Sequence, residues 1–357
     1  MGLCISESLA EMLRRPMREW IRAFTRAFQQ RNGWHKLGAA IGLVIVAFAL
    51  LTLFHLLRDI EIDKVVVALC LTSRYQILAA GACVAASYVT LTFYDYFSLR
   101  TIGRRDVPYR VAAMASFISY TIGHNLGATV FTAGTIRFRI YSAWGLGVVD
   151  VVKIAFITGL TFWLGNTFVL GVGLALEPEA ASVITQLSPD INRAIALIGF
   201  AIIAGYLLWL LPRPRIIGRA GWKITLPSAQ LTLIQIGIGI LDLTAGALAM
   251  YALLPADPSI DFITVQVIFV TAALLGFLSH APGSLGVFEA AMLIALPQFQ
   301  KEELLASLLI FRVLYFMLPF CAAVLLLSAR EGWLASKISA DKACAAAEAS
   351  ARSGRAP

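Results

Sequence analysis

The feature that most constrains this chain is its series of long apolar segments. Several run for about 20 residues with few charges, which is the length an α-helix needs to cross the hydrocarbon core of a bilayer. Hydrophobic residues make up 59% of the 357 residues and charged residues 14%, whereas soluble domains carry about 25% charged residues. Because a chain in lipid must satisfy its own backbone groups, the sequence predicts an all-α polytopic membrane protein.

Basic residues cluster beside the apolar segments and predict how the segments are oriented. By the positive-inside rule, we expect the N-terminus to lie in the cytoplasm. Complete crossings are expected at 37–57, 75–99, 148–172, 191–211, 229–254 and 304–327. The net charge of +8 follows from these cytoplasmic flanks and from contact with anionic lipid, so it does not predict binding to nucleic acid.

The chain divides into three expected parts. Residues 1–36 form a basic cytoplasmic segment, 37–330 form the membrane domain, and 331–357 form a polar cytoplasmic tail. Within the first part, apolar residues at helical spacing with Arg on the opposite side are typical of a helix lying on an anionic membrane surface. A basic tail that only sets orientation is the alternative. The five cysteines are scattered without a CxxC motif, so neither a disulfide framework nor a zinc site is predicted.

Two apolar segments, 111–130 and 262–297, are each interrupted by a His followed by Gly or Pro. At membrane depth, freed backbone groups are tolerated only inside protein or beside a watery cavity. We therefore expect each segment to form a broken re-entrant hairpin, with two coincidentally kinked helices as the alternative. The residues at or beside the expected breaks are His124, Asn125 and Gly127 in the first segment with Gly134 just after it, and His280, Pro282, Gly283 and Gly286 in the second segment.

The same order of features occurs in two halves, about 75–172 and 229–328. Each half has a span with an acid, a loop with Pro, an interrupted segment with its His, and a span with a base. The first half starts outside and the second inside. This pattern predicts inverted repeats, which are typical of transporters that work by alternating access.

Ionisable residues within the apolar segments are the candidate functional residues, because a charge is costly inside a bilayer. Arg137 and Arg139 have the fork geometry that binds a phosphate, or they act as positive-inside anchors. For Arg312, a structural ion pair with Asp242 or Glu289 is the alternative. The expected substrate path comprises Asp95, His124, Asn125, Arg137, Arg139, Asp242, His280, Glu289 and Arg312.

The sequence also excludes several kinds of chemistry. The four His residues lack a nearby Cys or Asp cluster, so no metal site is expected. No GxxxxGK[ST] loop is present, which argues against ATP-driven pumping, and no cofactor is expected. No nucleophile–base pair at usable spacing is evident, so catalysis within the membrane is the least favoured reading.

Two stretches resemble the signatures of a known family. The residues 124–127 with 134–146, and 279–280 with 282–289, resemble the membrane region of lysylphosphatidylglycerol synthases, also called multiple peptide resistance factors. The resemblance covers about 37–330. Acids also fall where that family carries them, in the pairs Tyr94-Asp95 and Leu241-Asp242.

The resemblance implies a lipid flippase in the bacterial cytoplasmic (inner) membrane. It would move aminoacylated phosphatidylglycerol from the inner to the outer leaflet and so contribute to resistance against cationic peptides. The family's C-terminal aminoacyltransferase domain is expected to be absent from this chain, so lysyl transfer is not expected of it. The implied partners are a phospholipid substrate, a separate or fused aminoacyl-lipid synthase and a second copy of the chain. The alternatives are transport of another lipid or small solute on the same scaffold, and a non-transporting membrane partner of a synthase.

Overall fold

A computed structural model describes residues 60–126, 129–179, 182, 187–211, 215–218, 223–333 and 336. The expected basic segment 1–36, the expected span 37–57 and residues 337–357 of the expected tail lie outside the described residues, as does Gly127.

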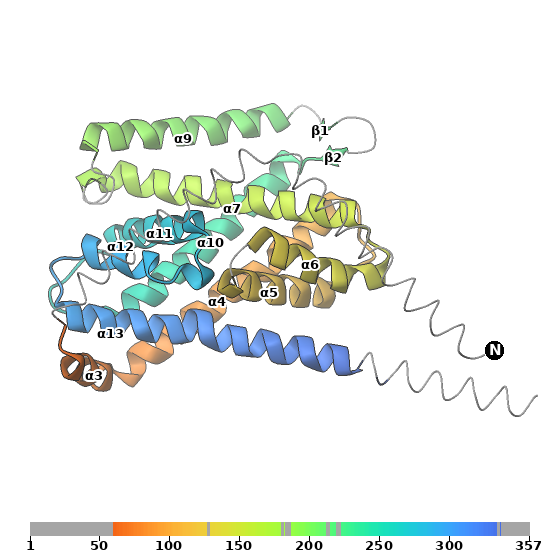
Figure 1. Cartoon of the computed structure of the whole chain (residues 1–357). Coiled ribbons are helices and arrows are strands. Elements are labelled where there is room, and N and C mark those ends of the chain that lie inside the picture. The colour runs from red at the N-terminus through yellow and green to blue at the C-terminus, as the bar shows by residue number, and fades with distance from the viewer. Residues whose placement is uncertain are drawn as a thin grey trace, which may run out of the picture.

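The described residues are almost entirely helical (Figure 1). The helices are α3 (Ile62–Leu71), α4 (Arg74–Thr101), α5 (Tyr109–Leu126), α6 (Thr129–Tyr141), η1 (Ser142–Trp144), α7 (Val148–Leu176), α9 (Pro189–Leu210), α10 (Ala229–Leu253), α11 (Phe262–Ser279), η2 (Pro282–Ser284), α12 (Val287–Ala295), α13 (Lys301–Arg312) and η3 (Val313–Met317). Two short antiparallel strands, β1 (Ile216–Ile217) and β2 (Ile224–Thr225), join α9 to α10.

Six of the described helices are long and apolar enough to cross a membrane. Five of them are α4, α7, α9, α10 and the long helix Lys301–Trp333, which contains α13 and the π-helical turn η3. These five coincide with expected crossings. The sixth is α11. It corresponds to the first arm of the second interrupted segment, where a re-entrant hairpin was expected. The described residues are thus those of an all-α polytopic membrane protein.

Several helix starts follow from local sequence. Ser73, Ser188, Ser228 and Asp261 each accept a hydrogen bond from a backbone N–H in the first turn of α4, α9, α10 and α11. Such caps satisfy donors that have no partner within the helix. By contrast, α3 was not expected. It forms in the charged segment after the expected first span and packs against α13.

The centre of the fold is α10, which contacts α4, α7, α11 and α13. Its crossing with α7 is close because glycines meet there. A Cβ atom added to Gly165 would lie 2.8 Å from the Cα of Gly239. Small residues let membrane helices approach at backbone distance. This close crossing fixes the middle of α10, and with it Asp242, in the interior of the bundle.

Each interrupted segment folds as two helices that pack against each other, α5 with α6 and α11 with α12. In Figure 1 the α5/α6 pair and the α11/α12 pair lie toward opposite ends of the molecule, and the helix containing α13 runs past both. In the first pair, α5 ends at Leu126 and α6 begins at Thr129. Gly134 lies inside α6 instead of at a break. A helix interior can accommodate one glycine at a cost of about 1 kcal/mol.

The second break is described in full. Pro282 and Gly283 lie in the short helix η2, and Gly286 precedes α12. Gly283 has a φ of 58° and Gly286 a φ of 80°, a backbone region that side chains with a Cβ rarely adopt. His280 also has a positive φ, of 56°, where α11 ends. The chain therefore turns sharply between the two helices.

Candidate functional site

A cavity of about 210 Å³ lies between the two helix pairs. The α5 helix contacts η2 beside it, so the C-terminal end of α5 meets the connection between α11 and α12. Ten of its 19 lining residues are Phe or Tyr, contributed by both helix pairs and by the helices between them. Its polar groups are Asp242, His124, His280, Ser284 and the hydroxyl-bearing Tyr94, Tyr120 and Tyr315.

Asp242, on α10, is 6% exposed and lines this cavity. Ser87 Oγ donates a hydrogen bond of 2.6 Å to Asp242 Oδ1, and the Tyr94 hydroxyl donates one of 3.4 Å to Oδ2. Among the residues that the structure describes, no Arg, Lys or His forms an ion pair with Asp242. Nor does the described cavity wall contain an Arg or Lys. The carboxylate therefore faces an aromatic cavity without an ion-pair partner from the described residues.

The hydroxyl groups around Asp242 connect it to η3. Tyr315 lies in the π-helical turn, and its hydroxyl is 3.4 Å from Ser87 Oγ. Tyr88 in turn donates to the Tyr315 carbonyl at 2.9 Å. π-helical turns are frequent at functional sites. Sequence reasoning missed Ser87 and Tyr315. The one available signal was spacing, since Ser87 and Tyr94 are seven residues apart and share one face of α4.

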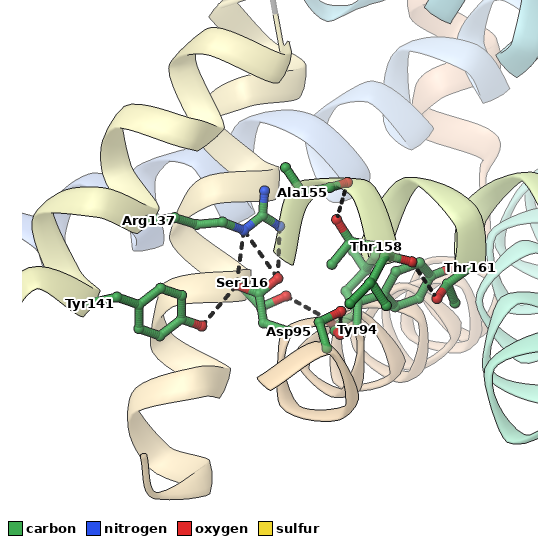
Figure 2. A network of polar contacts seen from close by, with 11 residues as sticks. Tyr94, Asp95, Ser116, Arg137, Tyr141, Ala155, Thr158 and Thr161 are labelled. Carbon is green, nitrogen blue, oxygen red and sulfur yellow. Dashed lines mark hydrogen bonds and ion pairs between the residues drawn. The ribbon is translucent and has the colours of Figure 1, made fainter. Parts of the chain in front are cut away.

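Asp95 and Arg137 form a buried pair that joins α4 to α6. Figure 2 shows the guanidinium of Arg137 facing the Asp95 carboxylate, with the Tyr141 hydroxyl on its other side. The Nη2–Oδ1 distance is 2.8 Å, the Nε–Oδ2 distance is 2.9 Å, and Tyr141 donates at 2.8 Å. The Arg137 guanidinium also lies 4.9 Å from the centre of the Tyr120 ring. Arg137 is thus committed to Asp95 and does not face the cavity.

Glu289 and Arg312 form the corresponding pair in the second half, joining α12 to α13. Arg312 Nε donates to Glu289 Oε1 at 2.8 Å, and Nη2 donates to the same oxygen. Arg312 Nη1 also donates to the carbonyl of Gly283 at 3.1 Å. The other carboxylate oxygen accepts from the Gly286 N–H at 2.8 Å. Of the two acids considered for Arg312, the structure therefore pairs it with Glu289.

The other expected site residues occupy different environments. Arg139 is exposed and pairs with Glu331 at 2.7 Å. His124 lies beside Tyr120, with ring centres 5.8 Å apart. Asn125 Nδ2 donates to the Thr121 carbonyl at 2.8 Å. No group of three or more His, Cys, Asp or Glu in the described residues could hold a metal ion.

The second His is fixed by backbone contacts at the end of α11. His280 Nδ1 lies 2.8 Å from the Leu278 carbonyl oxygen, and its ring stacks on Phe277 with ring centres 6.5 Å apart. Both His124 and His280 line the cavity, one from each helix pair.

These observations define a polytopic helical membrane protein whose cavity lies between two interrupted helix pairs. No family model matches the chain. It is 29% identical over 261 residues to the uncharacterized protein slr0712 of Synechocystis sp., covering 72% of this chain and 80% of that protein. It is 27% identical over 261 residues to the inner membrane protein YbhN of Escherichia coli, covering 71% and 79%.

A third relative is the phosphatidylglycerol lysyltransferase of Staphylococcus haemolyticus, with 24% identity over 310 residues. The match covers 84% of this chain but only 34% of the lysyltransferase, in its N-terminal part. With six helices among the described residues that are long and apolar enough to cross a membrane, the chain is a multi-pass inner membrane protein, related at low identity to YbhN and to this part of the lysyltransferases.

Proposed function

We propose that this protein is a lipid flippase that moves aminoacylated phosphatidylglycerol, of the lysyl type, from the inner to the outer leaflet. The observation that carries the proposal is the unpaired Asp242 carboxylate in an aromatic cavity. A lysyl headgroup carries ammonium groups. Ammonium ions bind carboxylates through charge-assisted hydrogen bonds and bind the faces of aromatic rings. Arg137 and Arg312, which would suit a bare phosphate, are already paired with Asp95 and Glu289.

The size of the cavity suits binding of the lipid headgroup alone rather than enclosure of the whole lipid. Its volume of about 210 Å³ is below the 300–1,000 Å³ or so of sites that enclose a drug-sized ligand. The polar headgroup would occupy the cavity, and the acyl chains would stay in the bilayer. A mostly apolar wall also favours an amphipathic substrate over a free polar solute.

We further propose that the two halves are inverted repeats and that α5/α6 and α11/α12 are re-entrant hairpins, within a membrane unit spanning 37–330. Two features support this arrangement. The pairs lie toward opposite ends of the molecule (Figure 1), and α5 meets η2 beside the cavity. Rocking one half against the other would then open the cavity to the cytoplasm and the outside in turn, with the N-terminus in the cytoplasm.

The relatives support a lipid as substrate and a synthase as a source of it. The name of the Staphylococcus haemolyticus protein refers to phosphatidylglycerol, a membrane lipid. A lysyl-lipid placed in the outer leaflet reduces the negative surface potential that attracts cationic peptides. The proposed consequence is resistance to such peptides. The proposed partner is an enzyme that makes the aminoacyl-lipid, fused to this chain or separate from it.

A cell assay tests the function. Cells that lack a flippase of this kind but contain a lysylphosphatidylglycerol-forming transferase would receive the full chain or a variant. An amine reagent that cannot cross the membrane would then report lysyl-lipid in the outer leaflet. We expect labelling to rise with the wild-type chain and with Asp190→Asn, whose side chain is 94% exposed, but not with Asp242→Asn. Equal labelling with and without the wild-type chain would contradict the proposal.

A further inference from the structure

We propose that Asp242 couples lipid movement to protons by exchanging its proton for the ammonium of the headgroup, which makes the protein a proton antiporter. This inference rests on the proposed flippase function and adds its energy source. It starts from the placement of the carboxylate, which is 6% exposed, accepts hydrogen bonds from Ser87 and Tyr94, and lacks a basic partner among the described residues.

When it is ionised, a buried carboxylate in this position needs a positive partner. The penalty for an isolated charge at membrane depth is several kcal/mol or more. The described residues include two arginines near the cavity, the buried Arg137 and the half-buried Arg312, but each already neutralises another acid, Asp95 and Glu289 respectively. The described residues thus supply no ion-pair partner for the ionised Asp242, and the cavity that it faces is where a partner can arrive.

The other titratable groups on the described cavity wall are Tyr and His, with no Arg or Lys among them. On the described cavity wall, α7 and α12 contribute Phe162 and Phe288, which do not titrate. His280 lies with Nδ1 2.8 Å from the Leu278 carbonyl, and His124 stands beside Tyr120. The titratable groups are Tyr94 of α4, Tyr120 and His124 of α5, His280 after α11 and Tyr315 of η3.

The exchange balances in atoms and charge. In the empty site the carboxyl group holds its proton and is neutral. When an ammonium headgroup enters from the cytoplasmic side, the carboxyl O–H bond breaks and the proton leaves to that side. The ammonium becomes the ion-pair partner of the carboxylate. On the outer side, the ammonium leaves as a proton from outside bonds to the carboxylate oxygen. No electrons are transferred. The site is neutral in both states, because the lysyl headgroup has two ammonium groups and one phosphate, and its single net positive charge balances the carboxylate.

Lipid and proton movement are coupled because the site can change between its inward-facing and outward-facing forms at low cost only when it is neutral. The neutral states are the protonated carboxyl group and the carboxylate paired with the ammonium. A site that is empty and ionised would have to move a bare carboxylate through the interior of the bundle. Each lipid that moves outward is therefore followed by one proton that moves inward, down the gradient that respiration maintains by pumping protons outward. The Ser87 and Tyr94 hydroxyls suit this cycle, because they can hydrogen-bond to the ionised oxygens while the ammonium is bound.

The test uses the purified full chain in phosphatidylglycerol vesicles with or without lysylphosphatidylglycerol. A trapped pH-sensitive dye reports proton movement, and an impermeant amine reagent reports lysyl-lipid in the outer leaflet. An imposed pH gradient should drive lysyl-lipid toward the acidic side. Dye-reported proton flux should require lysyl-lipid, and a protonophore should abolish the accumulation. Asp242→Asn should lose both signals, whereas Asp242→Glu should keep the coupling and Asp190→Asn should match the wild type.

The possible failures are distinguishable. Lysyl-lipid that equilibrates between the leaflets without proton flux, or gradient-driven accumulation that persists in Asp242→Asn, would overturn the coupling and leave the flippase function intact. No lipid movement by the wild-type chain under any gradient would overturn both. The thermal unfolding of each purified variant, compared with wild type, separates lost coupling from lost folding, and Asp242→Glu tests the carboxylate independently of the Asn variant.

Discussion

The Nη2 atom of Arg137 lies 2.8 Å from Oδ1 of Asp95, in a pair whose side chains are 5% and 0% exposed. A second contact, from Nε to Oδ2 at 2.9 Å, makes the pair bidentate. Through this pair α6, the second arm of the first helix pair, is attached to α4. The Glu289–Arg312 pair attaches α12 to α13 in the same manner, but with the acid on the interrupted segment and the base on the long helix.

The first prediction concerns removal of the Arg137 cation. Arg137→Gln leaves a fully buried carboxylate without its partner, and breaking a buried pair in this way costs about 3–5 kcal/mol. We expect a clear fall in the thermal unfolding temperature of the purified protein in detergent. The double variant Asp95→Asn with Arg137→Gln should be less destabilised than Arg137→Gln alone, since no uncompensated charge remains.

The control for this prediction is two residues away on the same helix. Arg139 pairs with Glu331, but its side chain is 64% exposed, and exposed pairs contribute about 0–1 kcal/mol. Arg139→Gln should unfold within a degree or so of wild type. If Arg137→Gln were equally mild, the structural role of the Asp95 pair would be refuted.

The second prediction concerns Glu289, which holds both the Gly286 N–H and Arg312. In Glu289→Gln the ion pair is lost, so the connection between α11 and α12 should open more often. A cysteine placed at Leu285, which is 53% exposed, should then react faster with a maleimide. Glu179→Gln, an exposed change on another part of the chain, is the matched control. Unchanged labelling in Glu289→Gln would mean that this pair does not hold the connection.

The complete crossings were predictable from the sequence because they depend on local properties. The expected crossing 229–254 corresponds to α10 at Ala229–Leu253, and 148–172 corresponds to α7 at Val148–Leu176. The length of an apolar run, the caps and the flanking charges fix such helices, whatever their neighbours. α3 was missed because its sequence is short and partly charged, and because it packs against α13, far away in the chain.

Which acid forms an ion pair with which base was not predictable from the sequence. Asp95 and Arg137 are 42 residues apart, and nothing local connects them. Arg312 had two acids within reach of a plausible fold, and the packing of α12 on α13 decides for Glu289. The hydroxyl partners of Asp242 escaped notice because neutral Ser and Tyr are common in membrane helices and carry no charge signal. Such contacts are a property of three-dimensional packing.

The third prediction concerns the crossing of α7 and α10. In Gly165→Ala the added Cβ would lie 2.8 Å from the Cα of Gly239, which is backbone and cannot rotate away. The two helices must separate, and overpacking of this kind costs about 1–3 kcal/mol. Gly159→Ala on the same helix is the matched control, because its Cβ would meet nothing within 4 Å. We expect thermal unfolding to separate the two variants, and equal stability would contradict the close crossing.

The last prediction concerns the meeting of the two helix pairs. Because α5 contacts η2 beside the cavity, cysteines that replace Asn125 and Ala281 should be joined by a short bifunctional reagent. A direct disulfide should also form if the Cα atoms come within about 7 Å. The background must lack the native cysteines at positions 4, 70, 83, 321 and 344. Asn125→Cys paired with Ile198→Cys, at an exposed position of α9, is the negative control. The crosslink is expected in membranes as well as in detergent, and substrate or a pH gradient should change its rate if the halves rock. No crosslink at all between 125 and 281 would contradict the arrangement of the cavity, and alternating access through it would have to be abandoned.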